Sequence, residues 1–512
     1  MKITNLQTGD IYFGEKDQML IDVLNQNNLF ITAPCGGKGI CGKCKLQLLP
    51  ADTPVSPQDL KLLTSAELEN GFRLACTFPL TQDISFFPPE EENGLVQIWK
   101  RTEDATFGIA VDIGTTTIEM VLVGCSGEKL AQFSMLNRQK SFGADVISRI
   151  NYTIEHSNGL SVLHQILLHQ INHMIDRLTE EYGCPKNAVK KAVVVANTTL
   201  IHLLLNRDPR SIAFYPFTPL LKEAQVLPPE ALPIHAQEID ILPCISAYIG
   251  ADITANMVYF DLEHAKKNIL VVDIGTNGEM ALAANGTILC CSTAAGPAFE
   301  GANISCGVGG VPGGVCRVWL EENRLRFHTI GNRDAVGLCG SGAIDLLAVL
   351  LELGIVDSSG YMADFSEVTS ITGMKIYRQS IREVDNEKRI YLTDKVWLSA
   401  KDIREFQLAK SAVFSGMQIL LREAGLAVPD RLIVTGGLGN HLNIESALRI
   451  GLFHPSLKEV IEVVENGALA GAVQCIDSAE FERSKRYKNT CNYIELSTHP
   501  DFSELYIENM EF

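Results

Sequence analysis

The sequence is poor in positive charge and has no long hydrophobic run. Lysine and arginine number 43 against 61 aspartates and glutamates, so the formal net charge is −18 at pH 7. A negative surface disfavours nucleic acid and anionic membranes as general partners. The most apolar stretches, such as residues 343–356, contain acidic residues and are too short to span a bilayer. We therefore expect neither a nucleic-acid-binding nor a membrane-spanning protein.

A secretory signal is also missing, because residues 1–20 show no basic flank followed by an apolar core. We expect a cytoplasmic protein whose cysteines are kept reduced. The fourteen cysteines are then better explained by metal ligation, where they cluster, than by disulfides. No H-E-x-x-H motif, P-loop or convincing Rossmann glycine motif occurs. Any metal or nucleotide site must therefore be of another type.

The length of the chain and a proline-containing, acidic segment near residue 90 indicate several domains. A chain of 512 residues is long enough for three or four. The pattern of residues 1–85 predicts short strands and turns. A proline pair followed by an acidic run comes directly after them. We predict an N-terminal domain over residues 1–86, a linker over 87–105, a first lobe over 106–268 and a second lobe over 269–512.

A repeat occurs in the larger, C-terminal part of the chain. Residues 109–123 and 269–283 both contain V-D-I-G-T between two apolar runs, which predicts a hairpin of buried strands with a polar tip. Two copies so far apart indicate a duplicated, two-lobed α/β domain. Helical spacing is found at 143–156, 162–183 and 409–426, and the segment 430–453 predicts a strand, a glycine-rich turn and a helix.

Three cysteines lie within ten residues near the N-terminus. Cys35, Cys41 and Cys44 have C-x5-C-x2-C spacing, and Cys76 follows downstream. The glycines between them permit a backbone that wraps closely and points N–H groups at sulfur, as a [2Fe–2S] cluster requires. A structural zinc site, which usually pairs two C-x2-C knuckles, and unligated thiols are the alternatives. The other ten cysteines are interpreted as small buried hydrophobes, with a second redox or metal role as the alternative.

The two repeated hairpins carry groups suited to phosphate. Asp112 and Asp273 stand where an apolar strand meets a glycine turn, and such carboxylates can hold Mg²⁺ directly or through water. Turn amides and nearby hydroxyls can bind phosphate oxygens; the tips supply Thr115, Thr116, Thr117 and Thr276, with Gly114, Gly275 and Gly278 allowing close approach. An ordinary hairpin tip is the alternative for either copy alone. Gly436 and Gly437, in the turn at 435–441, provide a plausible bed for adenosine.

These motifs resemble known families. The cysteine loop is similar to the ligand loop of plant- and adrenodoxin-type ferredoxins, with the adrenodoxin spacing, which implies a β-grasp one-electron carrier. The two hairpins and the turn at 435–441 resemble the phosphate and adenosine motifs of the acetate-kinase, sugar-kinase, Hsp70 and actin superfamily, and residues 463–472 resemble its second connecting helix. The implied fold class is α/β and multidomain, with a ferredoxin domain before a duplicated ATPase domain.

The order of motifs along almost the whole chain resembles the reductive activators of corrinoid-dependent methyltransferase systems. The segments that carry this likeness include 142–150, 193–205, 294–307 and 337–347. The resemblance implies that the protein accepts an electron at its cluster and uses ATP to reduce a partner corrinoid protein from cob(II)alamin to cob(I)alamin. It also implies a low-potential electron donor, not identified by the sequence, and a homodimer. The C-terminal tail has a single cysteine, which fits the two-iron branch of these activators.

The resemblance also assigns residues to roles. It gives the cluster to Cys35, Cys41, Cys44 and Cys76, Mg–ATP to Asp112, Gly114, Thr115, Thr116, Asp273, Gly275, Thr276 and Asn277, and the nucleoside to Gly436 and Gly437. Glu279 is our candidate for orienting the hydrolytic water or a metal, and a solvent-facing strand residue is the alternative. Glu300 is expected to line the nucleotide cleft, and Lys410 to reach the purine unless it is a solvated lysine.

Other functions remain open at this point. A small-molecule kinase with a ferredoxin-like sensor domain would need a substrate base that the sequence does not identify. An Hsp70-like binding protein would treat the cluster as merely structural. An activator of another low-potential metalloenzyme, such as a radical acyl-CoA dehydratase, would resemble only the nucleotide half. A ferredoxin reductase is disfavoured because no flavin or nicotinamide site is recognisable.

Overall fold

The computed structural model describes residues 1–33, 35–88, 94, 96–384, 386–438 and 441–512. The chain divides into two compact units, which are described separately below. Unit 1 comprises residues 1–192, 199–221 and 226–239, and unit 2 comprises residues 193–198, 222–225 and 240–512. This division passes through three strands, at residues 189–196, 225–227 and 238–241, and does not follow the domain boundaries predicted from the sequence, which stay a prediction.

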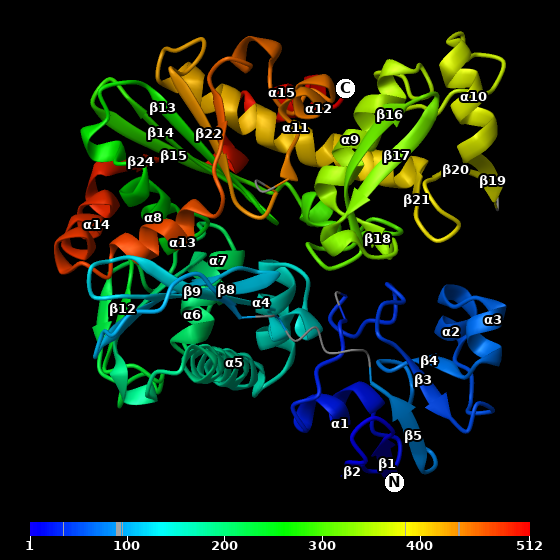
Figure 1. Cartoon of the computed structure of the whole chain (residues 1–512), viewed down its shortest axis with the longest axis horizontal. Coiled ribbons are helices and arrows are strands. Elements are labelled where there is room, and N and C mark those ends of the chain that lie inside the picture. The colour runs from blue at the N-terminus through cyan, green and yellow to red at the C-terminus, as the bar shows by residue number, and fades with distance from the viewer. Residues whose placement is uncertain (34, 89–93, 95, 385, 439–440) are drawn as a thin grey trace. The chain divides into compact units, whose positions relative to one another are not determined.

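The N-terminal part of unit 1 is a five-stranded sheet with the strand order β2-β1-β5-β3-β4. The first strand pairs parallel with β5 and antiparallel with β2. Leu20, Leu24, Leu48 and Phe86 belong to a core made only of residues from this part. A mixed sheet with a helix packed on its core confirms the predicted β-grasp class. The elements, coloured blue in Figure 1, are β1 (Lys2–Asn5), β2 (Ile11–Phe13), α1 (Leu20–Gln26), β3 (Lys45–Leu49), α2 (Pro57–Leu62), α3 (Ser65–Glu69), β4 (Phe72–Leu74) and β5 (Ile84–Phe87).

The following sheet has seven strands in the order β11-β12-β10-β7-β8-β9-β6. The long helix α5 packs on it and ends at Gly183, whose φ of 84° is left-handed, as the glycine there predicted. The helix predicted at 143–156 begins at Val146 because the Asp145 side chain caps it. The elements are β6 (Gln97–Ile98), β7 (Phe107–Ile113), β8 (Thr117–Val123), β9 (Lys129–Leu136), η1 (Arg138–Phe142), α4 (Val146–Glu155), α5 (Gly159–Tyr182), η2 (Lys186–Ala188), β10 (Val189–Ala196), α6 (Thr198–Leu204), α7 (Arg210–Ala213), β11 (Gln225–Leu227) and β12 (Glu238–Ile241).

The linker predicted at 87–105 stays a prediction, but its second half contains a short strand. Residues 97–98 form β6, which pairs antiparallel with β9 and extends the seven-stranded sheet at its edge. The Trp99 amide donates to the Leu130 carbonyl, which continues the pairing. Sequence reasoning missed this strand because two residues carry no detectable period. Residues 89–93 and 95 of the predicted linker lie outside the described residues.

Unit 2 is built on a six-stranded sheet with the order β23-β22-β13-β14-β15-β24 (Figure 1). Helix α11, confirmed as the predicted helix around residues 409–426, packs on β14 and β15, and α8 also contacts β14. Two three-stranded sheets, β17-β16-β18 and β19-β20-β21, complete the unit. Its helices are α8 (Ala251–Tyr259), η3 (Leu262–His264), η4 (Pro297–Glu300), η5 (Ile330–Asn332), α9 (Gly340–Glu352), α10 (Ile371–Ser380), α11 (Ala400–Glu423), α12 (Ile444–Arg449), η7 (Pro455–Leu457), α13 (Gly467–Gln474), α14 (Ser478–Thr490), η8 (Leu496–Thr498) and α15 (Phe502–Glu508).

The strands of unit 2 share one large hydrophobic core. This core includes Leu270, Val272 and Met280 from the central strands and Phe406 from α11, all fully buried. The strands are β13 (Ile269–Ile274), β14 (Gly278–Ala284), β15 (Thr287–Thr293), β16 (Gly314–Glu321), β17 (Arg324–Thr329), β18 (Gly337–Leu338), β19 (Ile381–Val384), β20 (Glu387–Tyr391), β21 (Trp397–Ser399), β22 (Arg431–Thr435), β23 (Ile461–Val463) and β24 (Cys491–Tyr493).

Helices α8 and α13 approach each other unusually closely within unit 2. A Cβ at Gly471 would overlap the carbonyl of Ala255, and one at Gly467 would overlap the Asn256 side chain. Only glycine allows two helix backbones this near to each other. The segment 463–472, predicted as a connecting helix, is helical from Gly467. Its close contact with α8 fixes its position in unit 2.

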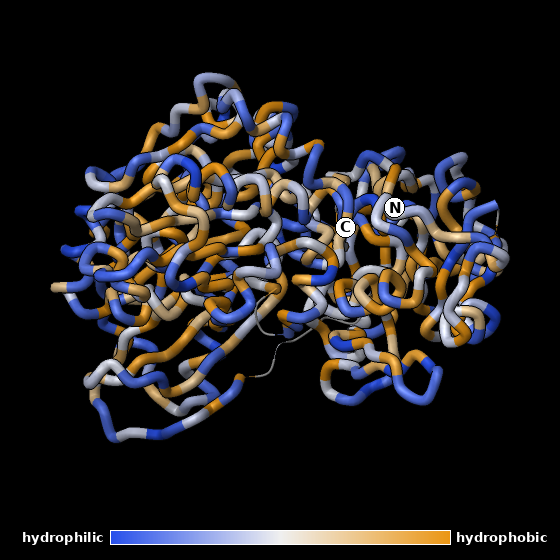
Figure 2. Tube along the Cα trace, turned by 90° about the horizontal axis from the view of Figure 1, so that it is seen from above, coloured by the Kyte–Doolittle hydropathy of each residue, from blue (hydrophilic) through white to orange (hydrophobic). Residues whose placement is uncertain are grey.

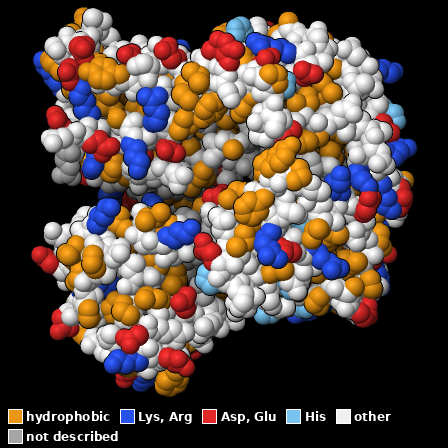
Figure 3. All heavy atoms as spheres, turned by 180° about the vertical axis from the view of Figure 1, so that it is seen from behind, with side chains coloured by type: hydrophobic (Ala, Val, Ile, Leu, Met, Phe, Trp, Pro, Cys, Tyr) orange, Lys and Arg blue, Asp and Glu red, His pale blue; other side chains and the backbone are white. Residues whose placement is uncertain are grey.

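The hydrophobic residues are spread along the chain. Within the described ranges no helix is both long and apolar enough to cross a membrane. Figure 2 shows hydrophobic and hydrophilic stretches alternating along the trace. On the face drawn in Figure 3, acidic and basic side chains are interspersed, and hydrophobic side chains gather in several separate patches.

Candidate functional site

The four cysteines predicted as cluster ligands come together in two pairs. The sulfur atoms of Cys35 and Cys41 are 3.4 Å apart, and those of Cys44 and Cys76 are 3.2 Å apart. Strands β3 and β4 explain the second pair, because Lys45 lies opposite Leu74 in their antiparallel register and the amide of Ala75 donates to the Cys44 carbonyl. The sheet thus joins a residue just before β3 to one just after β4.

The glycines of the cysteine loop shape its backbone. Gly36, Gly37, Gly39 and Gly42 all have φ between 62° and 80°, a region that favours glycine. This lets the amides of Lys38, Ile40 and Cys41 point at the Cys35 sulfur. The Cys41 thiol and these amides lower the pKa of Cys35 to about 4, and the pKa of Cys41 is raised in turn. The contact with Cys44 lowers the pKa of Cys76. The thiolate is the form of cysteine that binds metal, and a lowered pKa favours it.

The paired arrangement can be tested against the two metal centres considered for it. A [2Fe–2S] cluster has two irons, each with two protein ligands, which fits two cysteine pairs. A zinc ion would need four ligands around one point. The residues present therefore fit a two-iron cluster, surrounded by inward-pointing amides, better than zinc.

The first repeated hairpin is formed by β7 and β8. Asp112 lies opposite Glu119 across the two strands, and four residues, 114–117, make the tip between Ile113 and Ile118. The Gly114 amide donates to the Thr117 carbonyl at 2.9 Å, which closes the turn. Thr115 is buried, whereas Thr116 and Thr117 are half-buried.

Two residues outside the repeat hold this tip in place. The Asn137 side chain donates to the Gly114 carbonyl at 2.9 Å. Arg149, fully buried on α4, donates to the Thr115 carbonyl, to the Gly143 carbonyl at 3.1 Å and to the Gln139 side chain at 3.2 Å. Sequence reasoning did not single out Arg149. Its spacing from Val146 and Ile150 places it on the buried face of that helix, and this signal could have identified it.

The second hairpin, formed by β13 and β14, repeats this design with a shorter tip. Asp273 lies opposite Glu279, and three residues, 275–277, separate Ile274 from Gly278. The one-residue difference between the tips explains why the shared E-M pair is offset in the sequence. The Asn277 side chain donates to Glu279 at 3.0 Å, and the Thr276 hydroxyl donates to Glu300 at 2.7 Å.

Carboxyl groups are concentrated at this second tip. Burial and the charge of Glu300 raise the pKa of Asp273 to about 6, although the Asn256 amide, 2.7 Å away, opposes the shift. Burial and the charges of Asp252 and Asp273 raise the pKa of Glu279, which is buried rather than solvent-facing. Such a group of carboxyls favours a cation that would relieve their repulsion.

Asp252 is a member of this group that the sequence did not reveal. It lies in the first turn of α8, and burial together with the charge of Asp273 raises its pKa to about 7. An acidic residue in a first helical turn is common, because it complements the helix dipole. The sequence around Asp252 therefore held no signal that set it apart from an ordinary helix start.

The predicted adenosine turn follows β22, the strand parallel to β13. Thr435 is in register with Asp273, and a Cβ at the next residue, Gly436, would overlap the Asp273 carboxylate. Gly436 has a φ of 90°, and a Cβ at Gly437 would meet nothing within 4 Å. The glycines thus bring the turn against the second hairpin and leave open space beside it. Residues 439–440 of the predicted turn lie outside the described residues.

Lys410 does not lie in a solvated position. Its side chain is buried on α11, donates to the Glu511 carbonyl and lies 6.0 Å from the centre of the Phe512 ring. Burial lowers the pKa of this lysine to about 8. The solvated alternative is therefore wrong, while contact with a purine stays a prediction.

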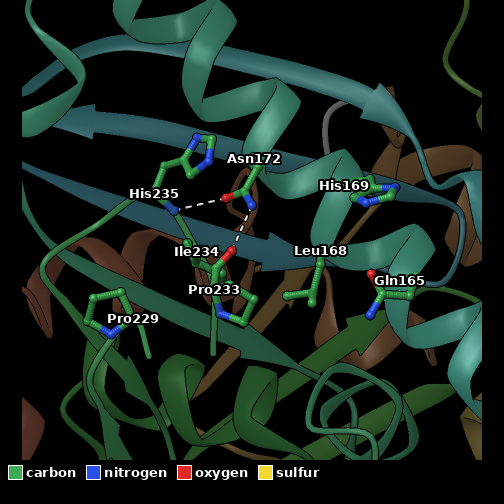
Figure 4. Close-up of a pocket in the computed structure, with 8 residues that line it drawn as sticks. All are labelled: Gln165, Leu168, His169, Asn172, Pro229, Pro233, Ile234 and His235. Carbon is green, nitrogen blue, oxygen red and sulfur yellow. Dashed lines mark hydrogen bonds between the residues drawn. The ribbon is translucent and has the colours of Figure 1, made fainter. Parts of the chain in front are cut away.

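Two pockets are found, and the second includes His441, the last residue of the predicted adenosine turn. One, of about 390 Å³, lies in unit 1 between α5 and residues 229–235, where Asn172 bonds to the backbone at Pro233 and His235 (Figure 4). The other, of about 340 Å³, is lined in unit 2 by residues such as Cys316, His328 and His441. Neither pocket is lined by a residue predicted to bind the cluster or phosphate.

Comparison with protein families divides the chain into three matched ranges. Residues 6–81 match the 2Fe-2S iron-sulfur cluster binding domain. Residues 107–265 match the RACo middle region, and residues 267–512 match the C-terminal domain of RACo, the ASKHA domain. The first match establishes a [2Fe–2S] domain, and the last establishes the actin- and sugar-kinase-like class of the C-terminal part.

Similar proteins extend over most of the chain. The corrinoid activation enzyme RamQ of Eubacterium limosum is 30% identical over 461 residues, which are 87% of this chain and 75% of that protein. The [Co(II) methylated amine-specific corrinoid protein] reductase of Methanosarcina barkeri is 23% identical over 449 residues, 79% of this chain and 77% of that protein. A solved structure of a reductive activator for corrinoid, iron-sulfur protein is 27% identical, covers 100% of this chain and 98% of its own, and has a TM-score of 0.73. The chain belongs to the RACo family of reductive corrinoid activators.

Proposed function

We propose that the protein is an ATP-dependent enzyme that delivers one low-potential electron to a corrinoid protein and so reduces cob(II)alamin to cob(I)alamin. The observation that carries this proposal is the presence, in one chain of this family, of a paired-cysteine loop and two Asp–Glu hairpins. A [2Fe–2S] cluster supplies one-electron transfer when it is bound. The hairpins supply what an uphill transfer requires, a means to use the free energy of a nucleotide.

In this proposal Cys35, Cys41, Cys44 and Cys76 ligate the cluster. The inward-pointing amides of the loop stabilise its negative charge, and the burial of Cys44 and Cys76 keeps water away from one side. Each ~59 mV of uphill one-electron transfer changes the equilibrium constant tenfold, about 1.4 kcal/mol. ATP turnover is proposed to cover this difference.

The nucleotide is proposed to bind as Mg–ATP at the two hairpins. Asp112 and Asp273 would hold Mg²⁺ through water, since Mg²⁺ usually keeps several waters and takes one or two carboxylates together with phosphates. The tip residues Gly114, Thr115, Thr116, Thr117, Gly275, Thr276 and Asn277 would bind phosphate, and Gly436 and Gly437 the nucleoside. Glu279, buried beside Asp252 and Asp273, is a candidate to orient the hydrolytic water or a metal.

The test is an anaerobic optical titration. The reduced protein is mixed with a corrinoid protein in the cob(II)alamin state, with and without Mg–ATP. We expect the cob(I)alamin spectrum only with Mg–ATP, and none with Cys76→Ser. Cys125→Ser, which changes an exposed cysteine, is the matched control and should behave as the wild type.

A loss of folding in Cys76→Ser would mimic the expected result, so nucleotide binding is measured on the same sample. If Cys76→Ser still binds nucleotide but no longer reduces the corrinoid protein, the defect lies in electron transfer. If cob(I)alamin forms equally without ATP, or never forms with several corrinoid proteins, the proposal is wrong. ATP-dependent phosphorylation of a metabolite would then favour the kinase alternative. Activation of another low-potential metalloenzyme would favour the alternative in which the protein serves that enzyme.

A further inference from the structure

The cysteine loop differs in charge from the rest of the chain. No acidic residue occurs between Asp22 and Asp52, but three lysines do: Lys38, Lys43 and Lys45. The whole chain, by contrast, has a net charge of −18. The charged side chains of this segment are therefore all basic, on a protein that is acidic overall.

The side chains of this loop point away from the cysteines. The amides of Lys38 and Ile40 point at Cys35, and the amide of Lys43 points at Cys41. Because the backbone turns inward, these side chains face outward, and both lysines are exposed. Ile40 is 70% exposed, among the highest values for a large apolar residue of the protein. The loop thus presents an exposed apolar side chain between two exposed lysines.

The neighbouring elements leave this surface open. Gln58 and Leu62 of α2 approach the loop at Gly39 and Gly42, and so cover one side of it. Lys45 is neutralised by an ion pair with Glu67. Among the described residues no ion pair is found for Lys38 or Lys43. The cluster-loop face, which we define as Lys38, Ile40 and Lys43, thus carries two positive charges around an apolar centre.

We propose that the cluster-loop face is the docking surface for a small acidic electron-carrier protein, which donates the electron to the cluster. This inference rests on the proposed function and names the class of its electron donor. One electron passes from the donor to the iron–sulfur centre; the donor is oxidised by one electron, the centre is reduced by one, and no bond forms or breaks.

Size and charge favour a donor over the corrinoid protein at this face. An apolar centre flanked by two charges is a small interface, of the kind found in weak, transient redox complexes. An acidic carrier is repelled by the net negative charge of the chain and attracted by the two lysines of this face, which would steer it towards the cluster. A partner that also engaged the large nucleotide-binding part would meet a predominantly acidic chain.

The test compares two doubly charge-reversed variants of the full-length, cluster-loaded protein. Lys38→Glu with Lys43→Glu changes the cluster-loop face, and Lys2→Glu with Lys16→Glu changes two exposed lysines on β1 and after β2. Both pairs change the net charge equally. The probe is an acidic flavodoxin, whose binding in the oxidised form is measured by calorimetry and whose reduced form is used to reduce the cluster.

We expect the first pair to weaken flavodoxin binding about tenfold or more at low salt, and the second to change it less than about threefold. The difference should shrink above about 0.5 M salt, where screening acts over a few ångströms. Cluster reduction by flavodoxin should fall in parallel, while the visible spectrum of the cluster stays unchanged.

Equal effects of the two pairs, unchanged binding in both, or no flavodoxin binding to the wild type would overturn the inference. So would normal flavodoxin binding combined with lost binding of the corrinoid protein, which would make this face the surface for the acceptor. Failure of the proposed function is distinct, because it would abolish ATP-dependent cob(I)alamin formation in the wild type whatever the donor.

Discussion

Asp252 shows how a single residue can belong to a site without any local sequence signal. It raises the pKa of Glu279 and has its own pKa raised by Asp273, although these residues are far from it along the chain. In the absence of a cation, the three carboxyls repel one another whenever they are ionised. This repulsion should be visible in the stability of the protein without nucleotide.

We predict that Asp252 and Asp273 make the nucleotide-free protein less stable as the pH rises from about 4 to 7, a contribution that is measured as a difference from a variant. The folded-state pKa values of Asp252 and Asp273, about 7 and 6, lie above the ordinary aspartate value. Over this window the folded state holds protons that the unfolded state has released, so stability decreases by up to about 1.4 kcal/mol per pH unit for each proton.

The prediction is measured as the unfolding temperature between pH 5 and 8, for the wild type and for Asp252→Asn. Relative to the wild type, the variant should have a higher unfolding temperature at pH 8, and this difference should shrink towards pH 5. Glu504→Gln, an exposed change on α15, should keep the wild-type slope. A variant whose slope equals that of the wild type would show that Asp252 is not part of the repulsive group.

At this scale the sequence predicted the residues that local motifs define. Cys35, Cys41, Cys44 and Cys76 are brought together as expected, and Asp273 and Glu279 lie opposite each other across one hairpin. Asp252 and Arg149 reach the hairpins from other elements, so only the tertiary structure reveals them. The role of Lys410 in nucleotide binding was inferred from resemblance, and its contact with the Glu511 carbonyl is a structural role that the sequence did not indicate.

Among the elements, the pair α8 and α13 depends most directly on residue size. The backbone of Gly471 lies against the Ala255 carbonyl, so the two helices cannot separate or rotate without loss of this contact. Asp252 and Asn256 both lie on α8, and Asn256 donates to Asp273. The packing of α13 therefore helps to fix two residues of the carboxyl group.

We predict that Gly471→Ala destabilises the protein by about 1–3 kcal/mol, the usual range for overpacking. Alanine is favoured over glycine in a helix by up to about 1 kcal/mol, but the overlap with the Ala255 carbonyl should outweigh this gain. Chemical denaturation measures the change. Gly310→Ala, where an added Cβ meets nothing within 4 Å, is the matched control and should cause no loss. Equal stability of the two variants would contradict the prediction.

Long elements were predicted well because their periodicity is strong. The helices α5 and α11 and both hairpins were expected, and the C-terminal glycine of α5 was identified. The two-residue strand β6 was missed and was included in the linker, because so short a strand is defined by its partner β9 and not by its own sequence.

For the whole molecule, separate hydrophobic cores indicate separate stability. The core that contains Cys44 and Cys76 is made only of residues up to Phe86, whereas the core of unit 2 is made only of residues from Leu270 onward. Two of the predicted cluster ligands are thus part of the N-terminal core itself. Metal loss should therefore affect that core first.

We predict at least two unfolding transitions in calorimetry. Removal of iron by a chelator under denaturant-free conditions should lower the transition of the N-terminal part, since metal binding and folding are coupled. Mg–ATP should raise a different transition by mass action and leave the first unchanged. A single transition that shifts with both treatments would show that the cores unfold together.

The unequal hairpin tips have a consequence for symmetry. Duplication preserved the pairing of Asp with Glu in both copies, but one tip has four residues and the other has three. The inserted residue leaves the strand register unchanged, so it alters only the number of backbone amides offered at the turn. The two copies are therefore no longer interchangeable, and a chemical group that suits one tip does not suit the other. The unequal tips therefore allow an internally repeated protein to bind an unsymmetrical ligand in one orientation.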